Sequence, residues 1–403
     1  MKIIKVESFA IQAPAQNGET YWGSRAWGSK TGNLSMPISA EYPTPQRRRY
    51  IYSQTIDTVV VRLTTEDGIV GFGESKAPVA PQATKFILDT LLAPIVLGAD
   101  PYDMTVIWER MYAGMRVRGH SAGFYLEAMS GIDIALWDIV GKKSGEPIAK
   151  LLGGIFRNPI RIYASGLPTL PIAASDAALE NLCIEAESLR DFGYQGIKLA
   201  MGRDIDGDLR CARLLRERLG PSFLLYGDAA GVYDRAQAMR VGKELESLDF
   251  GFFEMPIPPE DREGYAELAR ALAIPIALDS LMTRYETLDF LRRGGLDIVQ
   301  PDVCRAGGIT ECRRIAELSD AFGASFQPHI SIGSAIHFAA SAHLAASMPN
   351  TLTCEYWIGN NPLGNAVLET PIKVCDGYIY ASLDPGLGIH LREDALLQYS
   401  KKS

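Results

Sequence analysis

The sequence lacks several features that mark common protein classes. Six cysteines occur among 403 residues, and no two stand in a Cys-x-x-Cys arrangement, which argues against a zinc site or a thioredoxin-like motif. A chain of this length can build its core without disulfides, so reduced thiols in a cytoplasmic protein are the simplest interpretation. No apolar run approaches the ~20 residues of a membrane-spanning helix, and the N-terminal stretch is too short and too polar for a signal peptide.

An excess of basic residues is also missing. The chain has 40 Lys and Arg against 48 Asp and Glu, a net charge of −8, which argues against a nucleic-acid or anionic-membrane partner. An anionic substrate would therefore need local positive charge or a metal ion. Hydrophobic residues make up 47% of the chain, which is typical of a globular protein with a substantial core. The length predicts two or three domains, or one large barrel with an appendage.

The first ~130 residues have the pattern of an α+β unit. Residues 3–12 alternate like a strand, and 57–74 form two alternating runs around a Glu-Asp-Gly turn, which indicates a hairpin. Helical periodicity follows over 81–98 and 103–115.

The segment 14–49 is rich in Gly, Pro and Ser and carries no regular pattern. A stretch of this length inside a compact domain is either functional, as a lid is, or disordered. Its aromatic and basic side chains Tyr21, Trp22 and Arg25 are candidates for closing over a substrate.

Eight β-rich runs alternate with amphipathic helical runs from about residue 160 onward. The predicted strands are 159–165, 194–200, 222–228, 249–254, 274–279, 296–302, 324–329 and 351–357. The predicted helices between them include 208–219, 235–247, 262–272, 284–293, 309–322 and 334–347. A repeat of roughly 23–33 residues predicts a (β/α) barrel. The alternative, an open doubly wound sheet, usually begins with a Gly-x-Gly-x-x-Gly turn, and this sequence has none there.

Polar residues stand at the end of every predicted barrel strand. In chain order they are Ser165, Lys198, Asp228, Glu254, Asp279, Asp302, His329 and Glu355. In a parallel barrel these ends meet at one face, where catalytic residues lie. A single such residue is more often a helix cap, but caps favour Ser, Thr, Asn and Asp over Lys, Glu and His. The set therefore predicts one shared pocket.

The pocket contains three neighbouring carboxylates, Asp228, Glu254 and Asp279. Carboxylates placed together raise each other's pKa unless a cation neutralises them. Oxygen ligands suit Mg²⁺, whereas zinc prefers His or Cys. The sequence therefore predicts a Mg²⁺ site.

A histidine and a carboxylate, His329 and Asp302, end two adjacent strands. A carboxylate bonded to one ring nitrogen fixes the tautomer and leaves the other nitrogen as a base. With Lys198 and Glu355 beside them, these groups suit removal of a proton next to a substrate carboxylate. Lys198 and the metal would hold the negative charge of the enediolate, and Glu355 would donate a hydrogen bond if it is protonated.

The sequence resembles the enolase superfamily, and within it the mandelate racemase subgroup. The resemblance is carried by GFGES at the hairpin end, SGIDIALWDIVGKKSGEPIAKLLGG (130–154), QPDVCRAGGIT (300–310), the PHI step at 328–330 and the late NPLGNAVLETPI and DPGLGI segments. It implies a (β/α)7β modified TIM barrel with an N-terminal α+β capping domain. On this model residues 1–130 form the cap with its specificity lid, 131–360 the barrel, and 361–403 a C-terminal segment that packs back on the cap.

The resemblance also implies roles for the strand-end residues. Asp228, Glu254 and Asp279 correspond to the Mg²⁺ ligands, His329 and Asp302 to the catalytic dyad, and Glu355 to the electrophilic carboxyl group. Members of the family lead us to expect a homo-oligomer as well.

Two positions depart from the family pattern. Racemases of this subgroup carry Lys-x-Lys at the end of the second strand, whereas this chain has Lys198-Leu199-Ala200 and so lacks the second base. The fifth strand usually ends in Gly-Glu, whereas here it ends in Asp279-Ser280, which leaves either residue as the third metal ligand.

One-base chemistry therefore fits best. We expect a Mg²⁺-dependent dehydratase (a hydro-lyase) of a sugar-derived 2,3-dihydroxy carboxylic acid, an aldonate or aldarate, that yields a 2-keto-3-deoxy acid. Ser165 and Arg305 are further candidates for touching this small-molecule carboxylate. Two alternatives remain: a sugar-acid lactone cycloisomerase or epimerase of the same superfamily, and a metal-free carboxylate-binding protein without activity.

Overall fold

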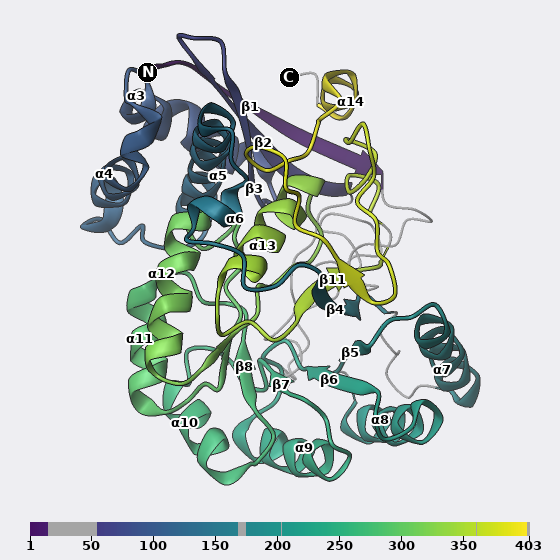
Figure 1. The fold of residues 1–403 in the computed structure, drawn as a ribbon. Coiled ribbons are helices and arrows are strands. Elements are labelled where there is room, and N and C mark those ends of the chain that lie inside the picture. Colours follow the sequence, from purple (N-terminus) through teal and green to yellow (C-terminus); the bar gives the residue numbers. More distant parts are fainter. Residues whose placement is uncertain (15–54, 168–174, 203, 360, 401–403) are drawn as a thin grey trace, which may run out of the picture.

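The computed structural model has an antiparallel sheet with helices at its N-terminal end, followed by a barrel-like parallel sheet ringed by helices (Figure 1). It describes residues 1–14, 55–167, 175–202, 204–359 and 361–400. The candidate lid residues Tyr21, Trp22 and Arg25 lie outside the described residues. The predicted fold class, a (β/α)7β barrel with an α+β cap, is confirmed.

The N-terminal sheet contains β1 (Ile3–Pro14), β2 (Thr55–Thr65) and β3 (Val70–Ser75), paired in that order and antiparallel throughout. The central strand β2 is buried on both faces because alternate side chains enter two different cores. Val59 and Val61 pack with the helices of the N-terminal unit, whereas Val60 packs with the cluster that continues into the barrel. The sheet is thereby fixed against the barrel.

The helices of the N-terminal unit are α2 (Pro81–Ile87), α3 (Ala93–Val96), α4 (Met104–Arg116) and α5 (Phe124–Ser144). The predicted helical segment 81–98 is not one α-helix: a π-helical turn, η4 (Leu88–Leu92), separates α2 from α3, and a 3₁₀ turn, η5 (Pro101–Asp103), precedes α4. Pro94 has no N–H to continue the α-helical ladder, which accounts for the change of hydrogen bonding at this point.

Helix α5 packs directly on β3 because glycines face each other. A Cβ atom on Gly73 would lie 1.8 Å from the Gly131 carbonyl oxygen, and one on Gly131 would lie 2.3 Å from Ser75 Oγ. The GFGES and SGIDIALWD motifs therefore meet at one backbone contact. The helix runs across residue 130, where the sequence analysis places the domain boundary.

Eight parallel strands form the second sheet, in the order β10-β9-β8-β7-β6-β5-β4-β11. They are β4 (Ile160–Ser165), β5 (Gly196–Ala200), β6 (Leu224–Asp228), β7 (Phe253–Glu254), β8 (Ile276–Leu278), β9 (Ile298–Val299), β10 (Ser325–Phe326) and β11 (Cys354–Trp357). Among the described residues no ladder joins β10 to β11, so the hydrogen-bonded sheet stays open at that seam. All eight predicted strands exist, but most are shorter than predicted.

Seven helices follow the first seven of these strands and cover the outside of the sheet (Figure 1). They are α7 (Asp176–Asp191), α8 (Ile205–Leu219), α9 (Arg235–Ser247), α10 (Arg262–Ala271), α11 (Arg284–Arg293), α12 (Gly308–Ala321) and α13 (Ala335–Ser347). Local sequence fixes several starts: Asp234 and Gln237 form a reciprocal capping box on α9, and the Thr283 side chain caps α11. The predicted helix bounds hold to within a few residues.

Aromatic rings fill the barrel interior below the site. Tyr163, Tyr226 and Phe252 are buried together, with ring centroids 4.8 Å apart for Tyr163–Tyr226 and 4.1 Å apart for Tyr226–Phe252. Because this layer is packed, the polar side chains further along the strands collect above it at the carboxyl ends.

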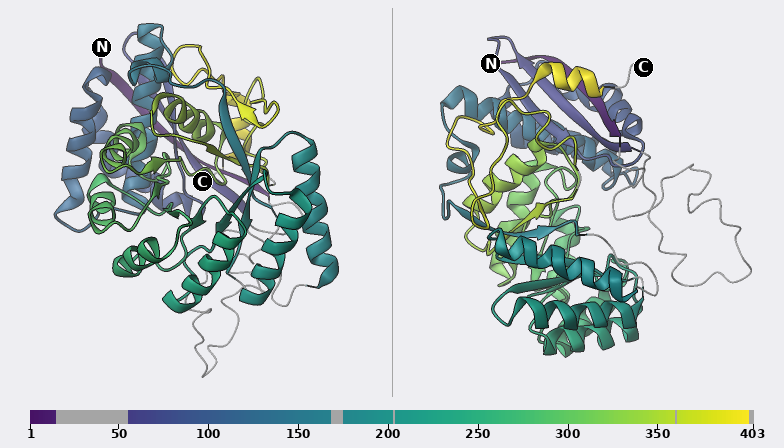
Figure 2. Two further views of the ribbon diagram at one scale, coloured as in Figure 1. Left: turned by 60° about the horizontal axis from the view of Figure 1, so that its bottom comes forward. Right: turned by 90° about the vertical axis from the view of Figure 1, so that its right-hand side faces the viewer.

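The C-terminal segment leaves the barrel after β11. Its short strand β12 (Tyr378–Ile379) pairs antiparallel with β4, and α14 (Glu393–Tyr399) contacts β1, where Ile11 and Ser400 form an isolated bridge. Figure 2 shows this yellow helix lying against the N-terminal sheet. A short helix, α6 (Ile148–Leu151), lies between α5 and the first barrel strand.

No single described helix is long and apolar enough to cross a membrane. The pair Pro81–Val96 and Pro101–Arg116 passes the test of length and composition only when taken together, and it is bent by 113° at its break.

Candidate active site

The predicted strand-end side chains are brought together at the carboxyl face of the barrel. Asp228 and Glu254 end β6 and β7 and are directly paired in the ladder, and Asp279, Asp302 and His329 follow β8, β9 and β10. Lys198 and Glu355 lie within β5 and β11, and Ser165 ends β4. Except for Asp279, whose side chain is 12% exposed, all of these groups are buried.

Lys198 lies at the centre of one group of carboxylates. Its Nζ is 2.9 Å from Glu254 Oε2, 2.9 Å from Glu355 Oε1 and 3.3 Å from Asp228 Oδ2. Burial by itself lowers the pKa of this lysine, but the three carboxylates outweigh burial and hold its pKa well above the usual value. Lys198 is therefore an ammonium ion in this arrangement.

Glu355 is ionised in the same arrangement. Burial tends to raise its pKa, but Lys198, through its charge and its hydrogen bond, does most to outweigh burial and hold the pKa below its usual value. Its second oxygen, Oε2, accepts the Ile330 N–H at 2.9 Å. These surroundings stabilise an acceptor, in contrast to the protonated, hydrogen-bond-donating Glu355 expected from the sequence.

Glu254 and Asp279 are carboxylates with too few partners. Glu254 Oε1 and Asp279 Oδ1 are buried and have no hydrogen-bond partner among the described residues. Burial and the neighbouring Asp228 raise the pKa of Glu254 well above its usual value. Buried carboxylate oxygens of this kind are costly unless a cation takes them as ligands.

A candidate metal cluster is formed by Glu254, Asp279 and His329, each with one ligand atom within 4.8 Å of the others. It shares Glu254 and Asp279 with the predicted ligand set. Asp228 stands beside it, with Oδ1 accepting the Ala230 N–H at 2.9 Å and Oδ2 facing Lys198. Of the two candidates after β8, Asp279 belongs to this cluster, and the neighbouring Ser280 Oγ is likewise buried with no hydrogen-bond partner among the described residues.

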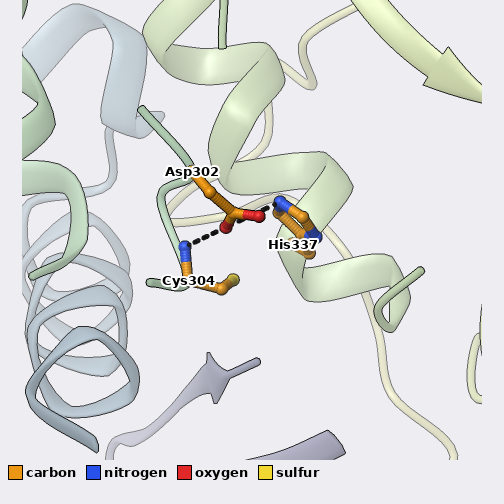
Figure 3. A group of neighbouring side chains, drawn as sticks. All are labelled: Asp302, Cys304 and His337. Atoms are coloured by element: carbon orange, nitrogen blue, oxygen red, sulfur yellow. Dashed lines mark hydrogen bonds and ion pairs between the residues drawn. The ribbon is translucent and has the colours of Figure 1, made fainter. Parts of the chain in front are cut away.

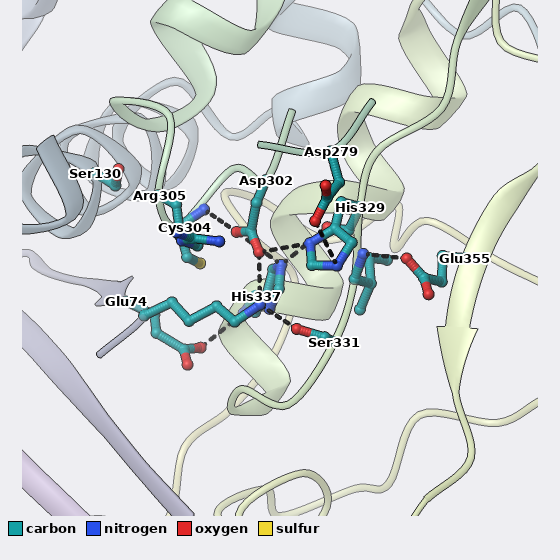
Figure 4. Close-up of polar contacts among 12 residues, drawn as sticks. Glu74, Ser130, Asp279, Asp302, Cys304, Arg305, His329, Ser331, His337 and Glu355 are labelled. Carbon is teal, nitrogen blue, oxygen red and sulfur yellow. Dashed lines mark hydrogen bonds and ion pairs between the residues drawn. The ribbon is translucent and has the colours of Figure 1, made fainter. Parts of the chain in front are cut away.

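The second carboxylate centre is Asp302, which is surrounded by donors (Figure 4). Its Oδ2 lies 3.0 Å from His329 Nδ1 and 2.8 Å from Lys76 Nζ. Its Oδ1 accepts the Cys304 N–H at 2.9 Å and lies 3.2 Å from His337 Nε2. Burial tends to raise the pKa of Asp302, but the charges of His337 and Lys76 and the His329 hydrogen bond outweigh it and hold the pKa well below its usual value.

An ionised Asp302 defines the state of the His329 ring. Because the carboxylate only accepts, Nδ1 carries a proton, so that in the neutral ring Nε2 is the nitrogen with the lone pair. Nε2 lies 3.7 Å from Asp279 Oδ2, on the side of the candidate metal cluster. The predicted pair is therefore present with the geometry of a base and its orienting carboxylate.

Three residues of this network were missed by the sequence analysis: Glu74, Lys76 and His337. Glu74, the last but one residue of β3, accepts the Ser334 and His337 backbone N–H groups at 2.7 and 3.0 Å, which holds the first turn of α13. The only sequence signal for Glu74 and Lys76 is their place at the end of the GFGES hairpin. His337 lies inside helix α13, so a search for polar residues at the ends of predicted strands does not find it.

A second group of metal-ligand type side chains, Asp302, Cys304 and His337, is shown in Figure 3. Burial and the neighbouring Glu74 and Asp302 raise the pKa of the Cys304 thiol well above its usual value, which disfavours the thiolate that binds metals. The Lys76 ammonium already neutralises Asp302. These contacts fit an internal ion-pair network better than a metal site.

Arg305 and Ser165, the two other described residues that were predicted to contact the substrate, differ in their surroundings. Arg305, in the turn after β9, is partly exposed and pairs with Glu127 of α5, with Nε 3.3 Å from Oε1. Burial lowers its pKa, but Glu127, Asp302 and Asp279 outweigh burial and raise it. Ser165 is buried at the end of β4, paired with Trp357 in the ladder.

A cavity of about 320 Å³ adjoins this network between β11, α13 and residues 358–359 and 361–372. Ser331, His337 and Trp357 are among its lining residues. His329 and the candidate metal ligands Asp228, Glu254 and Asp279 are not. It therefore neighbours the base without containing it.

A parallel barrel beneath an antiparallel cap, with buried carboxylates and a histidine at its carboxyl face, defines the class of barrel enzymes with a candidate divalent-metal site. Two family models match the chain: the mandelate racemase / muconate lactonizing enzyme N-terminal domain over residues 40–153, and an enolase C-terminal domain-like model over residues 181–395. The chain belongs to the enolase superfamily, in the mandelate racemase/muconate lactonizing subgroup. The resemblance inferred from the motifs is confirmed.

Two of the curated relatives of this chain are named for reactions on a sugar acid or its lactone. An arabinonate dehydratase of Saccharolobus solfataricus is 33% identical over 350 residues, covering 86% of this chain and 92% of the relative. A D-galactarolactone cycloisomerase of Agrobacterium fabrum is also 33% identical over 350 residues, covering 85% and 90%. A solved racemase from Streptomyces coelicolor with bound magnesium aligns with a TM-score of 0.82 at 26% identity, covering 99% and 100%. These relatives catalyse different reactions, so the reaction must be argued from the site.

Proposed function

We propose that this protein is a Mg²⁺-dependent dehydratase that converts a sugar-derived 2,3-dihydroxy carboxylic acid, an aldonate or aldarate, into a 2-keto-3-deoxy acid. The observation that carries the proposal is an oriented base, His329, whose Nε2 lies on the side of a buried carboxylate cluster.

Ala200, at the position of the second lysine of racemases, favours dehydration over racemisation. Ala200 is paired with Asp228 in the ladder, so a methyl group stands at the level where racemases of the subgroup carry a second lysine. Lys198 does not replace it, because three carboxylates keep it protonated. Inverting a carbon centre needs a proton acceptor on each face, whereas eliminating water needs only one.

The donor set suits a hard divalent cation. Asp228, Glu254 and Asp279 would hold Mg²⁺, since two of their oxygens are buried without partners and all of their ligand atoms are oxygen. A cation held there would supply Lewis-acid stabilisation of the enediolate. Lys198 adds a fixed positive charge beside the same carboxylates, where negative charge develops as the proton leaves.

One histidine, His329, can both remove the proton from the substrate and return it to the leaving hydroxyl group in this elimination. Nε2 takes the proton from C2, and the electron pair of the C–H bond forms the C1–C2 double bond of the enediolate, with its negative charge on the carboxylate oxygens. The charge then returns to form the carboxylate C–O bond, and the C1–C2 pair moves to form the C2–C3 double bond as the C3–O bond breaks. The protonated His329 returns the proton to the leaving 3-hydroxyl, which departs as water. The enol at C2 then becomes the ketone by transfer of a proton to C3.

Screening a library of aldonates and aldarates with Mg²⁺ tests this proposal. We expect a 2-keto-3-deoxy acid from at least one acid, detected by semicarbazide and by NMR, with activity lost in EDTA and restored by Mg²⁺. Wild-type protein that binds Mg²⁺ but dehydrates no member of the library would contradict the proposal.

A second candidate is cycloisomerisation of a sugar-acid lactone, which the similarity to D-galactarolactone cycloisomerase favours. It would use the same base on a cyclic substrate. Incubating matched lactone and open-chain acid pairs separates the two, because only a dehydratase consumes the open-chain acid with release of water.

A further inference from the structure

Lys76 links the N-terminal sheet to the catalytic dyad. It directly follows β3, its side chain is 5% exposed, and its backbone N–H bonds the Cys304 carbonyl at 3.1 Å. Its Nζ lies 2.8 Å from Asp302 Oδ2 and also contacts Ser331 Oγ. The backbone and the side chain of Lys76 are thus both anchored on barrel loops of the site.

The partner oxygen is shared with the base. Lys76 Nζ and His329 Nδ1 approach the same atom, Asp302 Oδ2, whereas the Cys304 N–H and His337 Nε2 occupy Oδ1. A carboxylate held by these donors cannot rotate without breaking charge-assisted hydrogen bonds. Lys76 therefore fixes the oxygen from which the His329 ring takes its orientation.

Lys76 also joins the two loops that carry the dyad. Asp302 follows β9, whereas Ser331 lies two residues beyond His329 in the loop after β10. One ammonium group thus contacts both loops. Glu74, two residues earlier on the same side of the hairpin end, holds the Ser334 end of the second loop.

We propose that Lys76 is a positioning residue for the general base: it holds Asp302 and the 329–331 loop so that His329 Nε2 is presented to the substrate. The orientation of the base then depends on docking of the N-terminal sheet. As regards turnover, this inference rests on the proposed function. The rival explanation is that Lys76 only neutralises a buried carboxylate and matters for stability alone.

The kinetic test compares Lys76→Met with Lys76→Arg. Positioning predicts that Lys76→Met lowers kcat by about 10- to 100-fold with KM and Mg²⁺ affinity nearly unchanged, since a small misplacement of reacting groups is costly. Lys76→Arg should recover much of kcat, because the charge and donors remain. Lys143→Met, which removes an exposed pair with Asp67 elsewhere in the N-terminal unit, is the matched control and should leave kcat unchanged.

A double variant tests whether Lys76 acts through Asp302. Lys76→Met should cost little further kcat when Asp302 is already Asn, because the carboxylate it holds is gone. Equal losses in both backgrounds would overturn the proposal. Should Lys76→Met fail to fold, Lys76→Gln keeps a hydrogen-bond donor, and the same comparison is made with it.

A readout without turnover separates this inference from the proposed function. The chain has five histidines, so ¹⁵N-histidine labelling gives a resolvable set of ring signals, and loss of one signal in His329→Asn assigns His329. We expect the His329 Nδ1–H signal in wild-type and Lys76→Arg protein, and its broadening or loss in folded Lys76→Met. If no acid sugar is turned over but this pattern appears, the proposed function fails and the positioning role stands. An unchanged signal in Lys76→Met would overturn the positioning role whatever the activity.

Discussion

Two carboxylate centres lie side by side at the carboxyl face of this barrel, and they are satisfied in opposite ways. Around Glu254 and Asp279, two buried oxygens have no partner among the described residues, and the pKa of Glu254 is raised by burial and by Asp228. Asp302 has two donors on each oxygen, and its pKa is lowered despite burial. The first centre therefore suits a cation from outside, whereas the second is neutralised by the chain itself and serves to orient a base.

The largest effect should come from the base that lies between the two centres. His329→Asn is expected to lower kcat by about 10³-fold or more, since general acid–base catalysis contributes up to about 10⁴-fold. Mg²⁺ affinity, measured by calorimetry, should stay within a few-fold if Asp228, Glu254 and Asp279 are the ligands. A large loss of Mg²⁺ binding would instead make His329 a metal ligand, as the 4.8 Å cluster permits.

Asp302→Asn and Glu254→Gln each remove one carboxylate, and their effects on the free energy of unfolding should depend on pH in different ways. In metal-free protein, Asp302→Asn is expected to cost about 3–5 kcal/mol, because it leaves buried Lys76 uncompensated. The folded-state pKa of Asp302 is lowered, so its stabilisation is present above the unfolded pKa of about 3.9 and is lost only as pH falls below it. The cost should therefore be the same at pH 5 and pH 8.

Glu254 should show the opposite trend in the same urea titrations. Its folded-state pKa is raised, so the stabilisation from its protonated form is full below the unfolded pKa of about 4.3 and declines as pH rises through the folded value. Glu254→Gln should thus become less costly, or stabilising, at pH 8 relative to pH 5. Parallel pH trends for the two variants would remove the distinction between the centres.

Mg²⁺ binding should depend on the carboxylate centre around Glu254 and Asp279 and not on the centre around Asp302. Glu254→Gln is expected to weaken Mg²⁺ binding by about 100-fold, because it removes the ligand charge from a buried site. In wild-type protein, Mg²⁺ at 100 times its Kd should stabilise the fold by about 2.7 kcal/mol, seen as a higher Tm that EDTA reverses. A wild-type Tm that Mg²⁺ does not change would favour the metal-free binding protein.

The smallest effect is expected at Cys304. Cys304→Ala should leave kcat and the stoichiometry of Mg²⁺ or Cd²⁺ binding unchanged, and should cost about 1 kcal/mol of stability from the lost packing of a small buried side chain. Loss of one bound Cd²⁺ per chain in this variant would show that the Asp302–Cys304–His337 group does hold a metal.

The barrel residues of the site could be predicted because strand register alone brings them together. Lys198, Asp228 and Glu254 come from neighbouring parallel strands, so their common face follows from the alternation of strands and helices. The strand bounds were less accurate: predicted strand 296–302 contains only the two-residue β9, because the chain leaves the ladder before Asp302 reaches the site.

Other features depend on contacts between distant segments. Nothing in the sequence near Lys76 shows that its ammonium meets Asp302, 226 positions further on, and the role of His337 depends on how the start of α13 is held by Glu74. The interruption of the predicted helix at η4 comes from Pro94 and from packing on the sheet, and periodicity does not detect it.

The sequence by itself determined the order of strands and helices, the barrel class and the set of polar strand ends, because hydrophobic periodicity and parallel topology are local and repetitive. Only the tertiary structure decided which carboxylates are left without partners and which is neutralised. That division depends on where the β3 end and α13 place Lys76 and His337, and so on the docking of one sheet onto another.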